Sequence, residues 1–237
     1  MRRAACLLAV VLAATGCEST QHKSARLARQ GAKSFTATGL HVRHRNARVK
    51  VVATQALQDT NGAAAVVVLR SSAAAGLRGV PIGLVVRGRG GKVLFKNDDP
   101  GLEPSLTGPS VLPAGREFAW VNDQVVADSK VAKVDAIAGE EKDQVRKALP
   151  KLQLSKARLQ GDPTSGIEAT GTVTNRSQVE QHDLVLYCVA RHGSRIVAAG
   201  RGEVPRLKAG RRRTFHIFFI GDPRGAALSI EAPPTSL

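Results

Sequence analysis

The 237-residue sequence has few cysteines and few aromatic residues. Its three cysteines, Cys6, Cys17 and Cys188, are too few for the disulfide framework that supports many small secreted proteins. Aromatic residues make up only 3% of the chain, with one Trp and one Tyr, so the sequence offers no evident platform for stacking nucleic-acid bases. We therefore expect no nucleic-acid partner, although the formal net charge is +16.

Residues with catalytic or metal-binding chemistry are scattered along the chain. The histidines are not spaced with cysteines or acids as metal ligands usually are. His182 and Asp183 follow Ser177 without a nucleophile elbow, so a polar turn is the favoured interpretation. The acidic loop 97–103 could offer oxygens to Ca²⁺, but it lacks EF-hand spacing and consists of ordinary turn formers. We expect no enzyme activity, metal or cofactor, and a hydrolase site assembled from scattered residues is the weaker alternative.

The first 16 residues have the layout of a secretory signal peptide. Arg2 and Arg3 precede an uncharged apolar run, Ala4 to Ala14, which is shorter than the about 20 residues that a membrane-spanning helix needs. The small residues directly before Cys17 resemble the lipobox of bacterial lipoproteins. That resemblance implies that residues 1–16 are removed and that Cys17 carries a lipid, which would hold the protein outside the cytoplasm on a bacterial membrane.

Two alternatives to the lipid anchor remain open. The chain could be an ordinary secreted protein in which Cys17 is incidental, or Cys17 could form a disulfide with Cys188. Cys188 could also bridge to another molecule. Because Cys188 stands in an apolar, strand-like run, we expect a buried thiol that behaves as a small hydrophobe.

Basic residues are concentrated just after the signal peptide. The whole chain has 35 Lys+Arg against 19 Asp+Glu, and residues 18–50 contain a single acid, Glu18. We expect residues 17–45 to form a flexible basic tether, which anionic headgroups attract at about 1 kcal/mol per basic residue. A merely solvated tether is the alternative. The candidate anionic-surface contacts are Lys23, Arg26, Arg29 and Lys33, and the basic series continues with Arg43, Arg45, Arg48 and Lys50.

The body of the chain carries a faint internal repeat. Leu112-Pro-Ala-Gly-Arg116 and Leu207-Lys-Ala-Gly-Arg211 share one spacing, and an aromatic residue, Trp120 or Phe215, comes eight residues after each Leu. Short apolar and β-branched runs surround them, separated by Gly, Pro, Asn and Asp, a pattern typical of β-sandwiches and barrels. We predict an all-β fold with two tandem sandwich domains, 46–137 and 151–232, and a tail over 233–237.

The segment between the two predicted domains differs in composition. Residues 138–150 are charged, contain Val145 as their only β-branched residue after Ala138, and end at Pro150. Their acids precede their bases, which suits the helix dipole. The segment is therefore predicted to be a short helical linker.

The second half resembles the immunoglobulin-like modules of the FxLYD type, which occur in exported bacterial proteins and lipoproteins. The resemblance covers Lys151 to about Ala232, and Leu186 and Tyr187 match the naming motif. Leu184 stands where that family has Phe, and Cys188 where it has Asp. The resemblance implies an immunoglobulin-like β-sandwich outside the cytoplasm, with no catalytic residues.

One further basic cluster begins a predicted strand beside Gly210. Such a cluster is a candidate contact for an anionic surface, although charges that guard an exposed strand edge give the same pattern. The expected function is therefore that of a lipid-anchored envelope protein whose two modules bind another envelope protein or an anionic wall polymer. A purely structural spacer is the alternative, and no small-molecule substrate is identified. The residues of this cluster are Arg211, Arg212 and Arg213.

Overall fold

A computed structural model describes residues 38–237, and this part of the chain is all-β. Within it, no helix is both long and apolar enough to cross a membrane. The first half contains β1 (Val49–Asp59), β2 (Gly62–Ser71), β3 (Leu77–Arg78), β4 (Ile82–Gly88), η1 (Arg89–Gly91), β5 (Val93–Lys96), η2 (Pro104–Leu106), β6 (Val111–Leu112), β7 (Glu117–Val125), β8 (Val131–Ala138) and β9 (Asp143–Gln144). The second half contains β10 (Leu152–Leu154), β11 (Arg158–Asp162), β12 (Gly166–Asn175), β13 (Gln181–His192), β14 (Arg195–Leu207), β15 (Arg212–Phe218), β16 (Ile220–Gly221) and β17 (Ala227–Glu231).

The same pattern of antiparallel pairing occurs in both halves. In the first half, β2 lies between β1 and β7, and β4 lies between β5 and β8. In the second half, β12 lies between β15 on one side and β10 and β11 on the other, and β13 lies between β14 and β17. In chain order, β12 therefore corresponds to β2 and β13 to β4. A small sheet of β6, β3 and β9 belongs to the first half alone.

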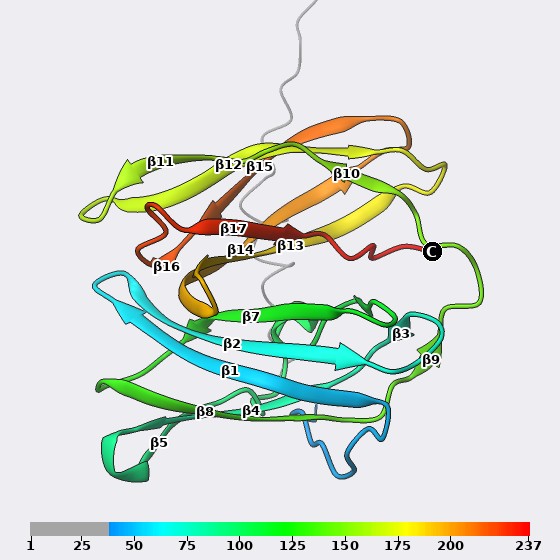
Figure 1. Cartoon of the computed structure of the whole chain (residues 1–237). Helices are drawn as coiled ribbons and strands as arrows, with labels where there is room; N and C mark the ends of the chain where they lie inside the picture. Colours follow the sequence, from blue (N-terminus) through cyan, green and yellow to red (C-terminus); the bar gives the residue numbers. More distant parts are fainter. Residues whose placement is uncertain (1–37) are drawn as a thin grey trace, which may run out of the picture. The chain divides into compact units, whose positions relative to one another are not determined.

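The two Leu-x-Ala-Gly-Arg segments occupy matching places in this pattern. Each forms the turn before a strand, β7 or β15, and both strands begin on the right-hand side of Figure 1. Gly115 has φ 67° and Gly210 has φ 66°, a left-handed conformation that favours glycine. The aromatic residue that follows each turn, Trp120 or Phe215, is fully buried. The shared sequence spacing thus corresponds to a shared turn and a shared core position.

The helical linker predicted over residues 138–150 is wrong. This segment contains no helix, and Asp143–Gln144 instead form β9 on the edge of β3. Just beyond it, the backbone N–H of Val145 donates to the oxygen of Gly76 at 2.8 Å. A short charged segment has little helical stability of its own, whereas an exposed strand edge offers it ready hydrogen-bond partners.

The four main sheets stack as layers (Figure 1). The sheet of β12 and β15 packs on the sheet of β13 and β14 around one apolar cluster. A second cluster continues from the sheet of β13 and β14 through that of β1, β2 and β7 to that of β4 and β8. The first half and the second half therefore meet through a continuous apolar core.

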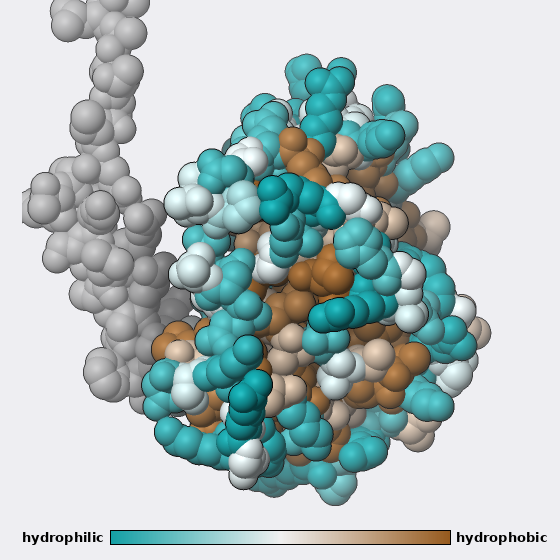
Figure 2. Space-filling model, turned by 60° about the vertical axis from the view of Figure 1, so that its left-hand side comes forward, coloured by the Kyte–Doolittle hydropathy of each residue, from teal (hydrophilic) through white to brown (hydrophobic). Residues whose placement is uncertain are grey.

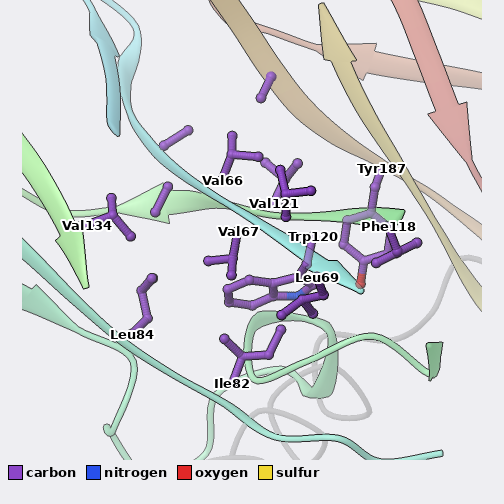
Figure 3. Packing of buried hydrophobic residues seen from close by; sticks show 14 of the residues in the cluster. Val66, Val67, Leu69, Ile82, Leu84, Phe118, Trp120, Val121, Val134 and Tyr187 are labelled. Atoms are coloured by element: carbon purple, nitrogen blue, oxygen red, sulfur yellow. The ribbon is translucent and has the colours of Figure 1, made fainter. Parts of the chain in front are cut away.

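The central strands of the two inner layers, β2 and β13, are largely buried on both faces. On β13, Leu184 and Leu186 belong to one apolar cluster, while the alternating Val185 and Val189 belong to the other. Successive side chains of a strand point to opposite faces, so both faces of this sheet are covered by protein. Along β2, residues 63–69 are all buried, and Figure 3 shows neighbouring valines on opposite sides of the strand. Continuous apolar runs are expected in strands with this environment.

Two side-chain contacts mark the junction between the halves. Tyr187 on β13 meets Phe118 on β7 edge to face, with ring centroids 5.4 Å apart and an interplanar angle of 77°. Such a pair contributes about 0.5–1.5 kcal/mol beyond its buried area. Arg201 on β14 forms an ion pair with Asp123 on β7 at 2.8 Å, and little of either side chain is exposed. The junction therefore combines an aromatic contact with a largely buried ion pair.

Candidate functional site

Most of the segment predicted to form a basic tether lies outside the described residues. This applies to the predicted lipidation residue and to four predicted anionic contacts, namely Cys17, Lys23, Arg26, Arg29 and Lys33. On the face shown in Figure 2, hydrophilic side chains cover most of the surface, and hydrophobic ones show between them in the middle of the body.

Arg211 lies in the turn between β14 and β15, Arg212 and Arg213 are the first residues of β15, and all three are exposed. The Arg211 oxygen accepts a hydrogen bond from the Asn175 N–H at 2.8 Å, which holds this turn against the end of β12. Within the part of the chain that the structure describes, none of the three arginines forms a salt bridge. The predicted cluster is thus available to an anion, but it stands at an exposed strand start and lines neither the groove nor the cleft described below.

A groove of about 810 Å³ lies at one end of the first half. It is formed where β1 begins, where β2 ends and where β8 ends. Four basic residues line it, two from the chain just before β1, one from β1 and one from β2, and they are Arg45, Arg48, Lys50 and Arg70. The groove therefore continues the basic series that begins in the tether.

Buried hydrogen bonds hold the entrance of this groove in place. The side chain of Asn46 is buried, and its Oδ1 accepts from the Arg48 backbone N–H at 2.9 Å. Its Nδ2 donates to the Gly139 oxygen at 3.2 Å, and its own backbone N–H donates to the Ala138 oxygen at 2.9 Å. A buried amide with all its hydrogen bonds formed holds the backbone around it in one conformation. The basic side chains next to Asn46 therefore extend from fixed backbone positions.

The charges in the groove are only partly balanced by acids. Arg48 pairs with Glu141, and Arg70 pairs with Glu117 at 2.6 Å. Lys50 lies directly opposite Arg70 in the register of β1 and β2. Like charges that face each other across an antiparallel pair are destabilising. Lys50 has no acid within salt-bridge distance among residues 38–237, so this row retains a net positive charge.

None of these four residues was among the candidate anionic contacts expected from the sequence. Arg45, Arg48 and Lys50 belong to the basic series after Cys17, whereas Arg70 stands alone in the apolar run of β2. The position of Arg70 beside the basic series follows only from the register of β1 and β2, which sets it opposite Lys50. The structure does not bring the Arg211–Arg213 turn into the groove.

The described residues hold no group of three or more His, Cys, Asp or Glu side chains that could bind a metal ion. Cys188 is a free, buried thiol in the cluster between β12 and β13, and burial raises its pKa to about 12. Such a thiol is a poor nucleophile at neutral pH, because the thiolate is the reactive form.

Comparison with known proteins adds no family to these observations. No family model matches the chain, and no curated protein matches it either.

Proposed function

We propose that this protein is an exported, lipid-anchored and non-enzymatic protein of the bacterial envelope, and that its basic groove binds an anionic polymer. The observation that carries the proposal is the facing pair of Lys50 and Arg70 in a groove also lined by Arg45 and Arg48. A polyanion lying in the groove would offset the repulsion between these two cations and gain attraction from all four.

The position of the groove supports the same function. The residues predicted to form the tether lead directly into Arg45 and Lys50, so a lipid on Cys17 would keep the groove close to the anionic surface of the envelope. Basic residues near such a surface gain about 1 kcal/mol each from the surface potential. An anchored protein whose groove follows directly after the tether would bind polymer beside its own membrane.

The body of the proposed protein consists of two immunoglobulin-like modules. The repeated strand pairing, the paired glycine turns and the buried Trp120 and Phe215 support this interpretation. In the proposal, the modules form the rigid support and the groove is the binding site. The Arg211–Arg213 turn would be a second, weaker contact for the same polymer.

Retention on immobilised long-chain polyphosphate would test the groove. The test compares the full exported chain carrying Cys17→Ala with a version that also carries Arg45→Gln and Lys50→Gln. The matched control carries Arg89→Gln and Arg195→Gln, which remove two charges from exposed hairpin tips. We expect the groove variant to lose about five- to tenfold in affinity and the control to lose much less, because exposed charge contacts contribute about 0.2–1 kcal/mol each.

Each outcome decides between the alternatives. Equal losses in the groove variant and in the control would show that polyanions sense only net charge, and the groove would be rejected as a site. Complete absence of retention would favour the structural spacer. The anchor is tested separately by the intact mass of protein purified from its native membrane, where an unmodified Cys17 would contradict lipidation.

A further inference from the structure

A second hollow, here called the junction cleft, lies where the two halves meet. It has a volume of about 520 Å³, within the range of small-molecule sites. The loop around η2 and the segment before β4 form one side, and the beginning of β13 with part of β14 forms the other. Its walls are largely apolar and include Val80, Pro81, Pro104, Pro109 and Val185.

Acidic residues gather on the rim of the junction cleft. Glu103, Asp183 and Glu203 all line it, although the chain as a whole has a formal net charge of +16. Burial raises the pKa of Glu203, and the nearby carboxylates of Glu103 and Asp183 raise it further. None of the three forms a salt bridge with a Lys or Arg among residues 38–237. The rim therefore favours a positively charged guest.

Tyr187 brings a hydroxyl group to the same cleft. Its side chain is only 2% exposed, and Figure 3 shows its hydroxyl pointing away from β13, past Phe118. The neighbouring Trp120 indole N–H already donates to the Ser105 oxygen at 2.8 Å. The Trp120 N–H also lies beside the Tyr187 hydroxyl, but an indole N–H can only donate, so it offers no acceptor for the hydroxyl proton. A ligand that supplies an acceptor in the cleft would give this proton a hydrogen bond.

The basic groups near the cleft leave its negative character in place. Lys142 lines the cleft as its one cation other than histidine, while His182 lies 3.6 Å from Glu180, outside the acidic group. In the adjoining recess, Arg201 is already paired with Asp123. The three rim acids do not form a cluster that could hold a metal ion. An extended organic cation fits this spread of charge better than a single metal ion does.

We propose that the junction cleft binds a small organic ammonium compound with an apolar body and a hydrogen-bond acceptor. The ammonium group lies against Glu203, Asp183 and Glu103, the apolar body packs between Pro104 and Val185, and the acceptor receives the Tyr187 hydroxyl proton. This site is separate from the basic groove and shares no lining residue with it. A test of the junction cleft is therefore independent of a test of polymer binding.

Calorimetric titration of the full exported chain carrying Cys17→Ala tests the site. The probe is 4-methoxybenzylamine, which has an ammonium group, an aromatic body and an ether oxygen, and the matched neutral probe is 4-methoxybenzyl alcohol. We expect one equivalent of the amine to bind and the alcohol to bind at least about tenfold more weakly, since a hydrogen bond to a charged group contributes about 1.5–3 kcal/mol. Equal affinities for the two probes, or no heat with either, would overturn the proposal.

Three variants locate the binding. Glu203→Gln is expected to weaken the amine about tenfold, and Tyr187→Phe about threefold, because it removes only the donor. Glu168→Gln is the control, since Glu168 lies on β12 beside His216 and outside the cleft. Each variant is first checked for an unchanged melting temperature. An amine affinity that is the same in Glu203→Gln and in the control would place the binding elsewhere and reject the cleft.

Discussion

Arg201 holds Asp123 with two hydrogen bonds across the junction of the halves. Its Nε donates to Oδ1 at 2.8 Å, and its backbone N–H donates to Oδ2 at 3.0 Å. The Arg201 side chain is 9% exposed and that of Asp123 is 19% exposed, so water screens this pair only weakly. The pair therefore joins β14 to β7, which belong to two different sheets.

Removing Asp123 should therefore destabilise the whole body. Asp123→Ala leaves Arg201 buried without its acid, and we expect the free energy of unfolding to fall by about 3 kcal/mol. Urea unfolding measures this loss. The control is Glu117→Ala, which breaks the exposed pair with Arg70 and should cost less than about 1 kcal/mol. A loss in Asp123→Ala no larger than in the control would show that the pair does not stabilise the junction.

Two substitutions of Tyr187 should separate the contribution of its ring to stability from the contribution of its hydroxyl. Tyr187→Phe keeps the ring against Phe118 and removes only the hydroxyl, so we expect a change in stability of less than about 1 kcal/mol. Tyr187→Ala removes the ring as well and should cost about 3–5 kcal/mol. Thermal unfolding of the two variants gives the comparison. A large loss in Tyr187→Phe would mean that the hydroxyl is bound to the protein.

The buried thiol predicts a dependence of stability on alkaline pH. The pKa of Cys188 is about 12 in the fold, against an ordinary value of 9.0. Above pH 9 the unfolded chain loses this proton while the folded chain keeps it, so ionisation favours the unfolded state. The stability that depends on the protonated thiol is complete below pH 9 and declines as the pH rises toward 12.

The matching experiment compares the wild-type chain with Cys188→Ala between pH 8 and pH 11 by urea unfolding. We expect the stability of the wild type to fall more steeply above pH 9, by up to about 1.4 kcal/mol per pH unit. Parallel curves would contradict the burial of a free thiol. A folded wild-type chain that yields a Cys17–Cys188 disulfide on mass analysis would do so as well.

The paired glycine turns should respond alike to substitution. Gly115→Ala and Gly210→Ala each place a Cβ where no atom lies within 4 Å, so any cost comes from the left-handed backbone and not from crowding. We expect a loss of about 1–2 kcal/mol in each variant, measured by thermal unfolding. Asn at either position should recover part of the loss, because Asn tolerates this conformation. Clearly different losses at the two sites would argue against equivalent turns.

Much of the strand pattern could be predicted from the sequence, because alternating side chains and turn residues act locally. The all-β fold expected from the short apolar and β-branched runs is present throughout residues 38–237. The helix expected over residues 138–150 was wrong because its competitor, the edge of β3, lies far away along the chain. The conformational preferences of neighbouring residues do not reveal a strand edge that lies far away along the chain and supplies hydrogen bonds.

The joined core was not predicted, although a signal for it exists. Residues 63–69 and 184–190 are continuously apolar, and a strand covered on both faces has this composition. The runs were interpreted as parts of two separate sandwiches. In the candidate site, Arg45, Arg48 and Lys50 were expected only as a continuation of the basic series, and an isolated Arg70 acquires meaning only from its cross-strand partner.

The double-sided burial of β13 also affects how the protein can meet a long ligand. Because Val185, Tyr187 and Val189 join the core of the first half, the second half cannot swing freely on a hinge. The spacing between the basic groove and the Arg211–Arg213 turn is then constant. A polymer long enough to reach both would gain avidity from a preset span, whereas short oligomers would engage one of them at a time. In this respect the body would select ligands by length as well as by charge.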